Sequence, residues 1–201
     1  NTWATCLTID QLAAIWGPSS TIEAWNEVDP AFPAEPIKLF GPGTDSGTFD
    51  YFTGAVNGEE GASRTDFTPS EDDNVIVQGV SGSKGGLGYF GFTYFEENAD
   101  SLNAVQIDSG AGCVTPSAAT AQDGTYTPLA RPLYVYPSVT ALAKPEVAGF
   151  FQFYVDNDAS IAEGARYIPL NEAQRQQLVS DFESLLAQAG AGTSSPSTAS
   201  Q

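Results

Sequence analysis

The segment of this sequence best suited to chemistry is Asp45-Ser46-Gly47-Thr48, which follows an apolar run and a glycine-rich turn. The hydroxyl groups of Ser46 and Thr48 can donate hydrogen bonds, and Gly47 lets a ligand approach the backbone closely. A helix that begins here leaves its first N–H groups unpaired at the positive end of its dipole. The pattern predicts an oxyanion site. The alternative is an ordinary helix cap after a glycine turn, because Ser, Asp and Thr are common capping residues.

The segments around this site alternate between strand and helix patterns. Residues 37–40 predict a short buried strand, and a helix is expected from Ser46 to about Asn57, ending at Gly58. The other expected elements are helices over 9–16, 145–156 and 171–188, strands over 87–92, 104–107 and 132–136, and an apolar element of undecided type over 75–80. Alternating strands and helices predict an α/β fold.

The charge of the chain excludes some partners. The 201 residues carry 25 acidic and 7 basic side chains, for a formal net charge of −18. Such a surface repels nucleic acid and anionic membranes, so neither is an expected partner. Any anion must be held by local dipoles against the field of the whole protein.

The residue types that are absent exclude whole classes of site. The sequence has no histidine, which removes Ser-His-Asp catalysis and His-ligated metals. Two cysteines are too few for a Cys-based zinc or iron–sulfur site, so no metal or cofactor is expected. Cys6 and Cys113 are far apart and could form one disulfide in an oxidising compartment, or stay as two buried thiols.

The segment Ser46-Gly47-Thr48-Phe49-Asp50-Tyr51-Phe52 resembles the second-lobe motif of the PstS-type phosphate-binding proteins, which serve high-affinity phosphate ABC importers. The resemblance covers most of residues 1–187 and continues in blocks at 61–66, 70–74, 77–80, 85–91, 112–113 and 131–133. It implies a type II periplasmic-binding fold, with two α/β lobes, a hinge, and phosphate in the cleft between the lobes. It also implies a secreted protein of the periplasm or cell surface that passes inorganic phosphate to an ABC transporter permease without catalysis.

The resemblance carries site residues with it. It implies that Ser46, Gly47 and Thr48 bind phosphate, and Asp45 is the candidate carboxylate that accepts the proton of phosphate. Asp45 could instead only cap the helix. Many family members place an arginine four residues before the serine, where this chain has Pro42. We expect Arg64 to replace that cation because it lies in a block that resembles the family, with Lys84 as the alternative.

The family's first-lobe segments have no counterpart here, so the chain is expected to begin inside the second lobe and to leave the first lobe incomplete. Residues 1–130 are then the second lobe. A disulfide between Cys6 and Cys113, which the resemblance also favours, would cross-link this lobe internally. Residues 131–188 return to the first lobe, and 189–201 are a disordered tail or linker.

This division leaves apolar faces without a partner. They belong to residues 132–136 and to the helix that carries Val147, Phe150, Phe151 and Tyr154. A missing N-terminal segment of the same protein, or a second chain, is expected to cover them. The alternative is a single compact domain in which they pack against residues 1–130.

Two other functions remain as alternatives. One is a secreted acidic structural or assembly component, derived from a binding-protein fold that has lost its ligand. The other is a phosphatase with Ser46 as nucleophile. Thr48 occupies the position where a hydrolase elbow needs glycine, and without histidine Ser46 needs Lys84 or a metal to activate it.

Overall fold

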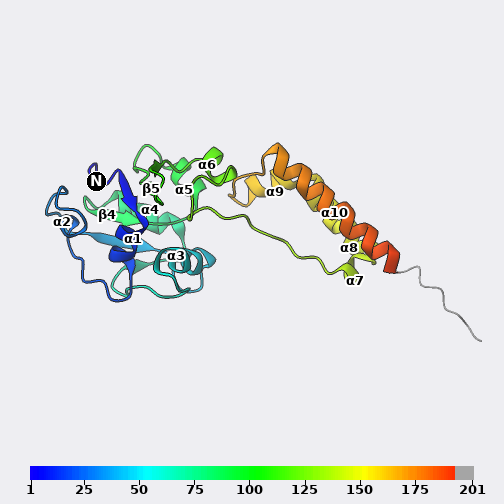
Figure 1. Ribbon diagram of the computed structural model, residues 1–201, viewed down its shortest axis with the longest axis horizontal. Coiled ribbons are helices and arrows are strands. Elements are labelled where there is room, and N and C mark those ends of the chain that lie inside the picture. Colours follow the sequence, from blue (N-terminus) through cyan, green and yellow to red (C-terminus); the bar gives the residue numbers. More distant parts are fainter. Residues whose placement is uncertain (193–201) are drawn as a thin grey trace, which may run out of the picture. The chain divides into compact units, whose positions relative to one another are not determined.

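The structure, a computed structural model, describes residues 1–192, and the chain divides into two compact units at Arg131 and Pro132. The elements of unit 1 (residues 1–131) are β1 (Cys6–Thr8), α1 (Ile9–Trp16), α2 (Trp25–Val28), β2 (Lys38–Gly41), α3 (Gly47–Asn57), β3 (Thr68–Pro69), α4 (Asp73–Ser81), β4 (Gly86–Gly88), α5 (Phe92–Glu97), β5 (Gln106–Asp108), β6 (Cys113–Val114) and α6 (Ala118–Gln122) (Figure 1). Those of unit 2 (from Pro132) are α7 (Val139–Leu142), α8 (Pro145–Asp156), α9 (Asp158–Gly164) and α10 (Glu172–Gly192). The predicted α/β class is confirmed.

One sheet of unit 1 has the order β1-β5-β6, in which β1 runs parallel and β6 antiparallel to β5. A disulfide joins Cys6 of β1 to Cys113 of β6, with an S–S distance of 2.00 Å. The predicted bond is therefore present, and it links the two strands that flank β5 across a sequence separation of 107 residues.

The other sheet of unit 1 is parallel and has the order β3-β2-β4, so β2 is its central strand. The helix α3 connects β2 to β3, and α4 connects β3 to β4. Because the carboxyl ends of parallel strands meet at one edge of a sheet, the loop over 42–46 leaves β2 at that edge. In open α/β sheets, ligands bind at this edge.

The two faces of β2 are both covered. Leu39 pairs with Leu87 of β4, and both belong to the core that contains α1 and α3. Phe40 points to the other face, where its ring lies so close to Gly79 of α4 that a Cβ atom there would overlap it. Gly88 is paired with Phe40 and meets Val80 and Ile76 of the same helix. Helices therefore pack on both faces of β2, as in doubly wound folds.

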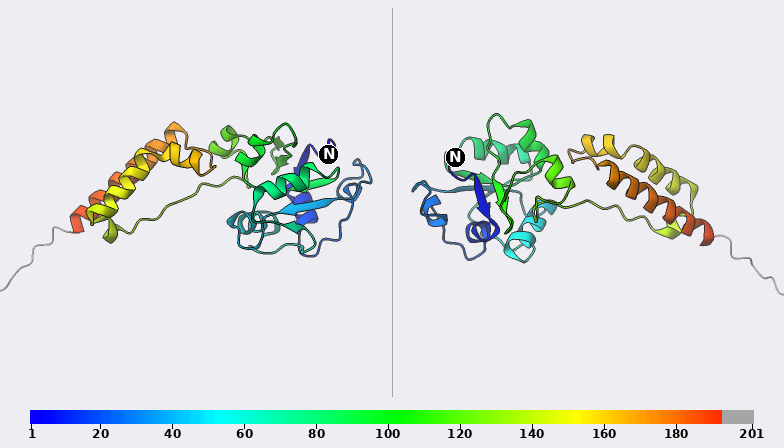
Figure 2. Two further views of the ribbon diagram at one scale, coloured as in Figure 1. Left: turned by 180° about the vertical axis from the view of Figure 1, so that it is seen from behind. Right: turned by 45° about the horizontal axis from the view of Figure 1, so that its top comes forward.

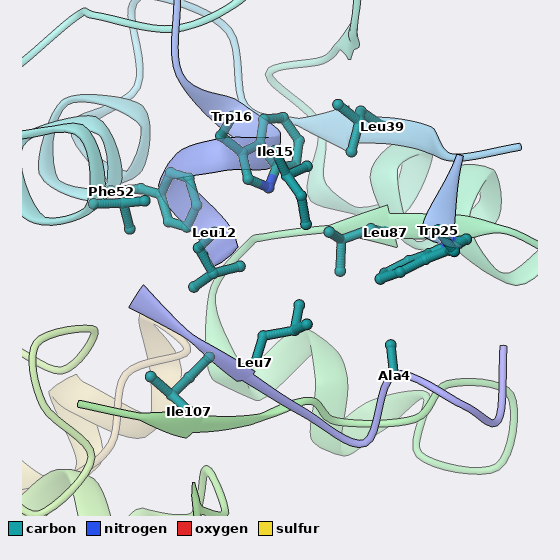
Figure 3. Packing of buried hydrophobic residues seen from close by; sticks show 11 residues of the cluster. Ala4, Leu7, Leu12, Ile15, Trp16, Trp25, Leu39, Phe52, Leu87 and Ile107 are labelled. Atoms are coloured by element: carbon teal, nitrogen blue, oxygen red, sulfur yellow. The ribbon is translucent and has the colours of Figure 1, made fainter. Parts of the chain in front are cut away.

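A single hydrophobic core joins the two sheets of unit 1 (Figure 3). Leu7 and Ile107 of the first sheet and Leu39 and Leu87 of the second sheet belong to this core, together with side chains of the helix α1. Trp16, at the end of α1, is 1% exposed and makes edge contacts with aromatic rings, those of Phe52, Phe67 and Tyr89. Through Phe52, the helix α3 is packed against this aromatic cluster.

Arg64 belongs to the structural framework of unit 1. Its side chain is 9% exposed and donates to the carbonyl oxygens of Ile15 and Ile22, to Ser20 Oγ, and through two nitrogens to the carboxylate of Asp66. The hydrogen bond from Arg64 lowers the pKa of Asp66 and raises that of the arginine.

Arg64 also lies at the wrong end of α3 for the role expected of it. Its N–H donates to the carbonyl of Trp16, which also accepts a bond from Asn57, the last residue of α3. A helix of 11 residues is about 16 Å long, at roughly 1.5 Å per residue. Arg64 therefore serves the fold, and its expected contact with phosphate at Ser46 conflicts with this placement.

Unit 2 has its own small core. Leu142, Val155, Phe182 and Ala189 are buried there, and α8 and α10 lie side by side in both views of Figure 2. Val147 and Phe151 of α8 pack against this core, contrary to the expectation that the face of this helix has no partner within the chain. Other apolar side chains are exposed: Phe150 and Phe153 at 61%, Tyr134 at 68% and Tyr136 at 85%.

Most predicted elements are confirmed, and Thr8 and Gln11 form a capping box at the start of α1. Three predictions were wrong. The strand expected over 87–92 ends at Gly88, and the helix α5 begins at Phe92, inside the expected strand. Residues 132–136 pair with no strand in the described chain. The helix α10 continues through 189–192, which were assigned to the tail, and 193–201 lie outside the described residues.

We expect Arg64→Lys to lower the free energy of unfolding by ~1–3 kcal/mol at pH 7, because a lysine cannot replace the donors that the guanidinium gives to buried carbonyls. Urea unfolding measures the change. The pair with Asp66 stabilises the fold above the ordinary Asp pKa of about 3.9 and is lost as the pH falls through the lowered folded-state pKa. The loss of unfolding free energy caused by Arg64→Lys should therefore be smaller at pH 2. The control is Lys84→Gln, whose exposed ion pair with Glu35 is worth less than ~1 kcal/mol.

Tyr89 gives a prediction at alkaline pH. Its hydroxyl is buried without a hydrogen-bond partner among the described residues, and burial raises its pKa well above 10. The folded state therefore holds this proton while the unfolded chain loses it, and wild-type stability falls as the pH rises above about 10. Tyr89→Phe should change the free energy of unfolding little at pH 7, and the variant should lose less of it at alkaline pH than the wild type does. If the variant has lost as much of its free energy of unfolding at pH 11 as the wild type has, the prediction is contradicted.

Candidate anion site at the start of α3

The helix α3 begins at the loop that leaves β2. Ser46 is its N-cap: the Ser46 N–H donates to the Gly43 carbonyl at 3.1 Å, and Ser46 Oγ accepts from the Thr48 N–H at 3.2 Å. The helix ends at Gly58, whose φ of 82° suits glycine. The capping interpretation of Ser46 is thus correct, and it leaves the hydroxyl proton of Ser46 free to donate to a ligand.

Other donors at this helix start have no protein partner. Within residues 1–192, the N–H groups of Gly47 and Phe49 and the hydroxyl of Thr48 make no hydrogen bond. Gly47 and Thr48 are exposed. Two backbone N–H groups, two hydroxyls and the positive end of the helix dipole therefore meet at one surface, which suits an oxyanion.

Arg131 is the cation at this surface. Its Nη2 donates to the Gly47 carbonyl at 3.2 Å, and its guanidinium lies over the Tyr51 ring, 4.6 Å from the ring centroid. The Tyr51 hydroxyl donates to the Pro128 carbonyl at 2.6 Å and lies 3.3 Å from that of Ala130. Tyr51 therefore fixes both the guanidinium and the backbone that carries it.

The structure separates the predicted site residues into two groups. Ser46, Gly47, Thr48 and Asp45 are contiguous at the helix start, where Asp45 is exposed and makes no bond to the described residues. Arg64 is at the other end of α3. Lys84 is bound to Glu35 at 2.6 Å, beside the amino end of β4, whereas the site follows the carboxyl end of β2.

Sequence reasoning missed Arg131 and Tyr51, although both lie in segments that carry the family resemblance. A count of cations could have found the arginine, because residues 1–131 contain only four: Lys38, Arg64, Lys84 and Arg131. No group of three His, Cys, Asp or Glu side chains in the described chain is placed to hold a metal ion. None of the helices in residues 1–192 is long and apolar enough to cross a membrane.

Known proteins resemble this chain over most of its length. Protein SphX of Synechocystis is 46% identical over 175 residues, which is 86% of this chain and 52% of the relative. The phosphate-binding protein PstS of Staphylococcus saprophyticus is 33% identical over 184 residues, which is 90% of this chain and 55% of that protein. The chain thus spans about half the length of these curated relatives.

A solved structure agrees with these sequence matches. A possible phosphate binding protein from Planctomyces limnophilus superposes with a TM-score of 0.85 at 44% identity, over 92% of this chain and 66% of that one. The model of the PBP superfamily domain matches residues 1–158. The chain therefore belongs to the PBP superfamily, and PstS-type phosphate-binding proteins are among its homologues.

Proposed function

We propose that this protein binds inorganic phosphate between two lobes and delivers it to an ABC importer, in the periplasm or at the cell surface. The observation that carries the proposal is the set of unpartnered donors at the start of α3, in a chain with phosphate-binding homologues. Phosphate binds without any bond being made or broken, so the protein acts as a carrier and not as an enzyme.

The donors at α3 make up one side of the site. The N–H groups of Gly47 and Phe49 and the hydroxyls of Ser46 and Thr48 bind the phosphate oxygens, and closure of a second lobe removes water from the ion. Loss of water strengthens each of these hydrogen bonds, because the local dielectric constant falls. Phosphate still carries a proton near neutral pH, and Asp45 is the candidate carboxylate within this chain to accept it.

We also propose that polypeptide outside this chain completes the first lobe and covers its exposed apolar side chains. Tyr134, Tyr136 and Phe153 are each more than half exposed. Leaving large apolar side chains in water gives up ~1.5–3 kcal/mol each, which is a large fraction of the stability of a small lobe. An N-terminal segment of the same protein, or a second chain, supplies the cover.

Replacement of Thr48 by valine tests the site. The change keeps the shape of the side chain and removes one donor, so we expect phosphate affinity to fall about ten-fold or more. Titration calorimetry, or amide chemical shifts where binding is weak, measures this. Thr65→Val is the matched control, because Thr65 is exposed in the loop after α3. Equal phosphate affinity in the two variants would show that Thr48 makes no contact.

Hydroxyl-radical footprinting tests the proposed cover. The added polypeptide is the part of Synechocystis SphX that lies outside the aligned 175 residues. We expect it to reduce oxidation of Tyr134, Tyr136 and Phe153 and to leave the exposed Val75 of unit 1 unchanged. If these three side chains are oxidised equally with and without the added polypeptide, the proposal of a shared lobe is contradicted.

A further inference from the structure

The phosphate site lacks the cation that many related proteins place four residues before the serine, and this chain has few cations to replace it. Of the four in unit 1, Arg64 is committed to buried carbonyls and Asp66, and Lys84 to Glu35. Lys38 begins β2, at the end of the strand away from the loop over 42–46. Arg131 is the one that remains.

Arg131 is also placed where the charge is needed. Its Nη2 lies 3.5 Å from the position that a Cβ atom would occupy on Gly47, the first residue of α3. A Cβ atom leans toward the helix start, so the guanidinium lies beside the exposed first turn. Among residues 1–192, Arg131 has no carboxylate partner and donates one hydrogen bond, to the Gly47 carbonyl. Most of its five donors therefore remain free.

The contacts of Arg131 hold it in place without neutralising it. The Tyr51 ring attracts the cation through its π face, and the Tyr51 hydroxyl ties the backbone at Pro128 to α3. Neither contact places a negative charge on the guanidinium. This differs from Arg64, whose charge is balanced by Asp66.

We propose that Arg131 is the arginine that binds phosphate in this protein, in place of one at position 42. The inference rests on the proposed function, because it names a further residue of the same site. Pro42 is buried in the loop that leaves β2, so a guanidinium at that position would displace packed groups. Arg131 reaches the same helix start from the last residue of unit 1 and can bind two phosphate oxygens at once.

The experiment titrates the 201-residue chain with inorganic phosphate and follows the amide signals of Gly47, Thr48 and Phe49 by NMR. Arg131→Gln keeps a side-chain donor for the Gly47 carbonyl but removes the charge, and we expect phosphate to bind ~10–100-fold more weakly. The matched control is Lys38→Gln, which changes the net charge equally at an exposed site. We expect it to weaken binding less than about two-fold, because salt screens distant charges.

The outcomes separate this inference from the proposed function. If the wild-type chain shows no phosphate-dependent shifts, either alone or mixed with the part of SphX outside the aligned residues, the proposed function fails. If the wild type binds and Thr48→Val weakens it, but Arg131→Gln binds as well as Lys38→Gln, the site stands and the role of Arg131 is overturned. The salt dependence of the association constant K gives a second readout. The slope of log K against log salt concentration should become less steep in Arg131→Gln and stay unchanged in Lys38→Gln. Equal slopes in the two glutamine variants would also overturn it.

Discussion

The strand β2 has hydrogen-bonded neighbours on both edges and packed side chains on both faces, and the candidate anion site at the start of α3 depends on this arrangement. Leu39 is fixed by the core that holds α1 and α3, and Phe40 by α4. Parallel pairing with β3 and β4 leaves the strand no freedom to slip, since a shift of one residue would exchange its two faces. The loop that follows and the first turn of α3 therefore begin from a fixed point.

Electrostatics explains why the proposed ligand groups are mostly backbone and hydroxyl donors. A chain with a net charge of −18 repels an anion at long range, although salt reduces this repulsion beyond about 10 Å. Short-range groups dominate inside that distance. Peptide N–H groups and hydroxyls carry no net charge, so they add binding energy without needing a counter-charge in the unbound protein. In the proposed site, a single exposed arginine, Arg131, supplies the remaining positive charge.

The sequence predicted the parts of the fold that local chemistry determines. Ser46 caps α3 and the helix expected over 145–156 begins at Pro145, because each effect involves residues within one helical turn. The role of Arg64 was not accessible in this way, since its acceptors Ile15 and Ile22 lie more than 40 residues away in the sequence. Arg131 is 84 residues from Gly47, so no spacing rule links them. The strand expected over 132–136 failed because β-propensity needs a pairing partner, which the described chain does not supply.

The Tyr51 hydroxyl also lies against the backbone that precedes the boundary of the two units. The carbonyls of Pro128 and Ala130 both lie within reach of this hydroxyl, so rotation of the chain before Arg131 would break a hydrogen bond. Pro132 comes directly after Arg131, and its ring restricts φ to about −65°. The guanidinium of Arg131, which lies over the Tyr51 ring, is therefore held to unit 1 and not to the chain that follows.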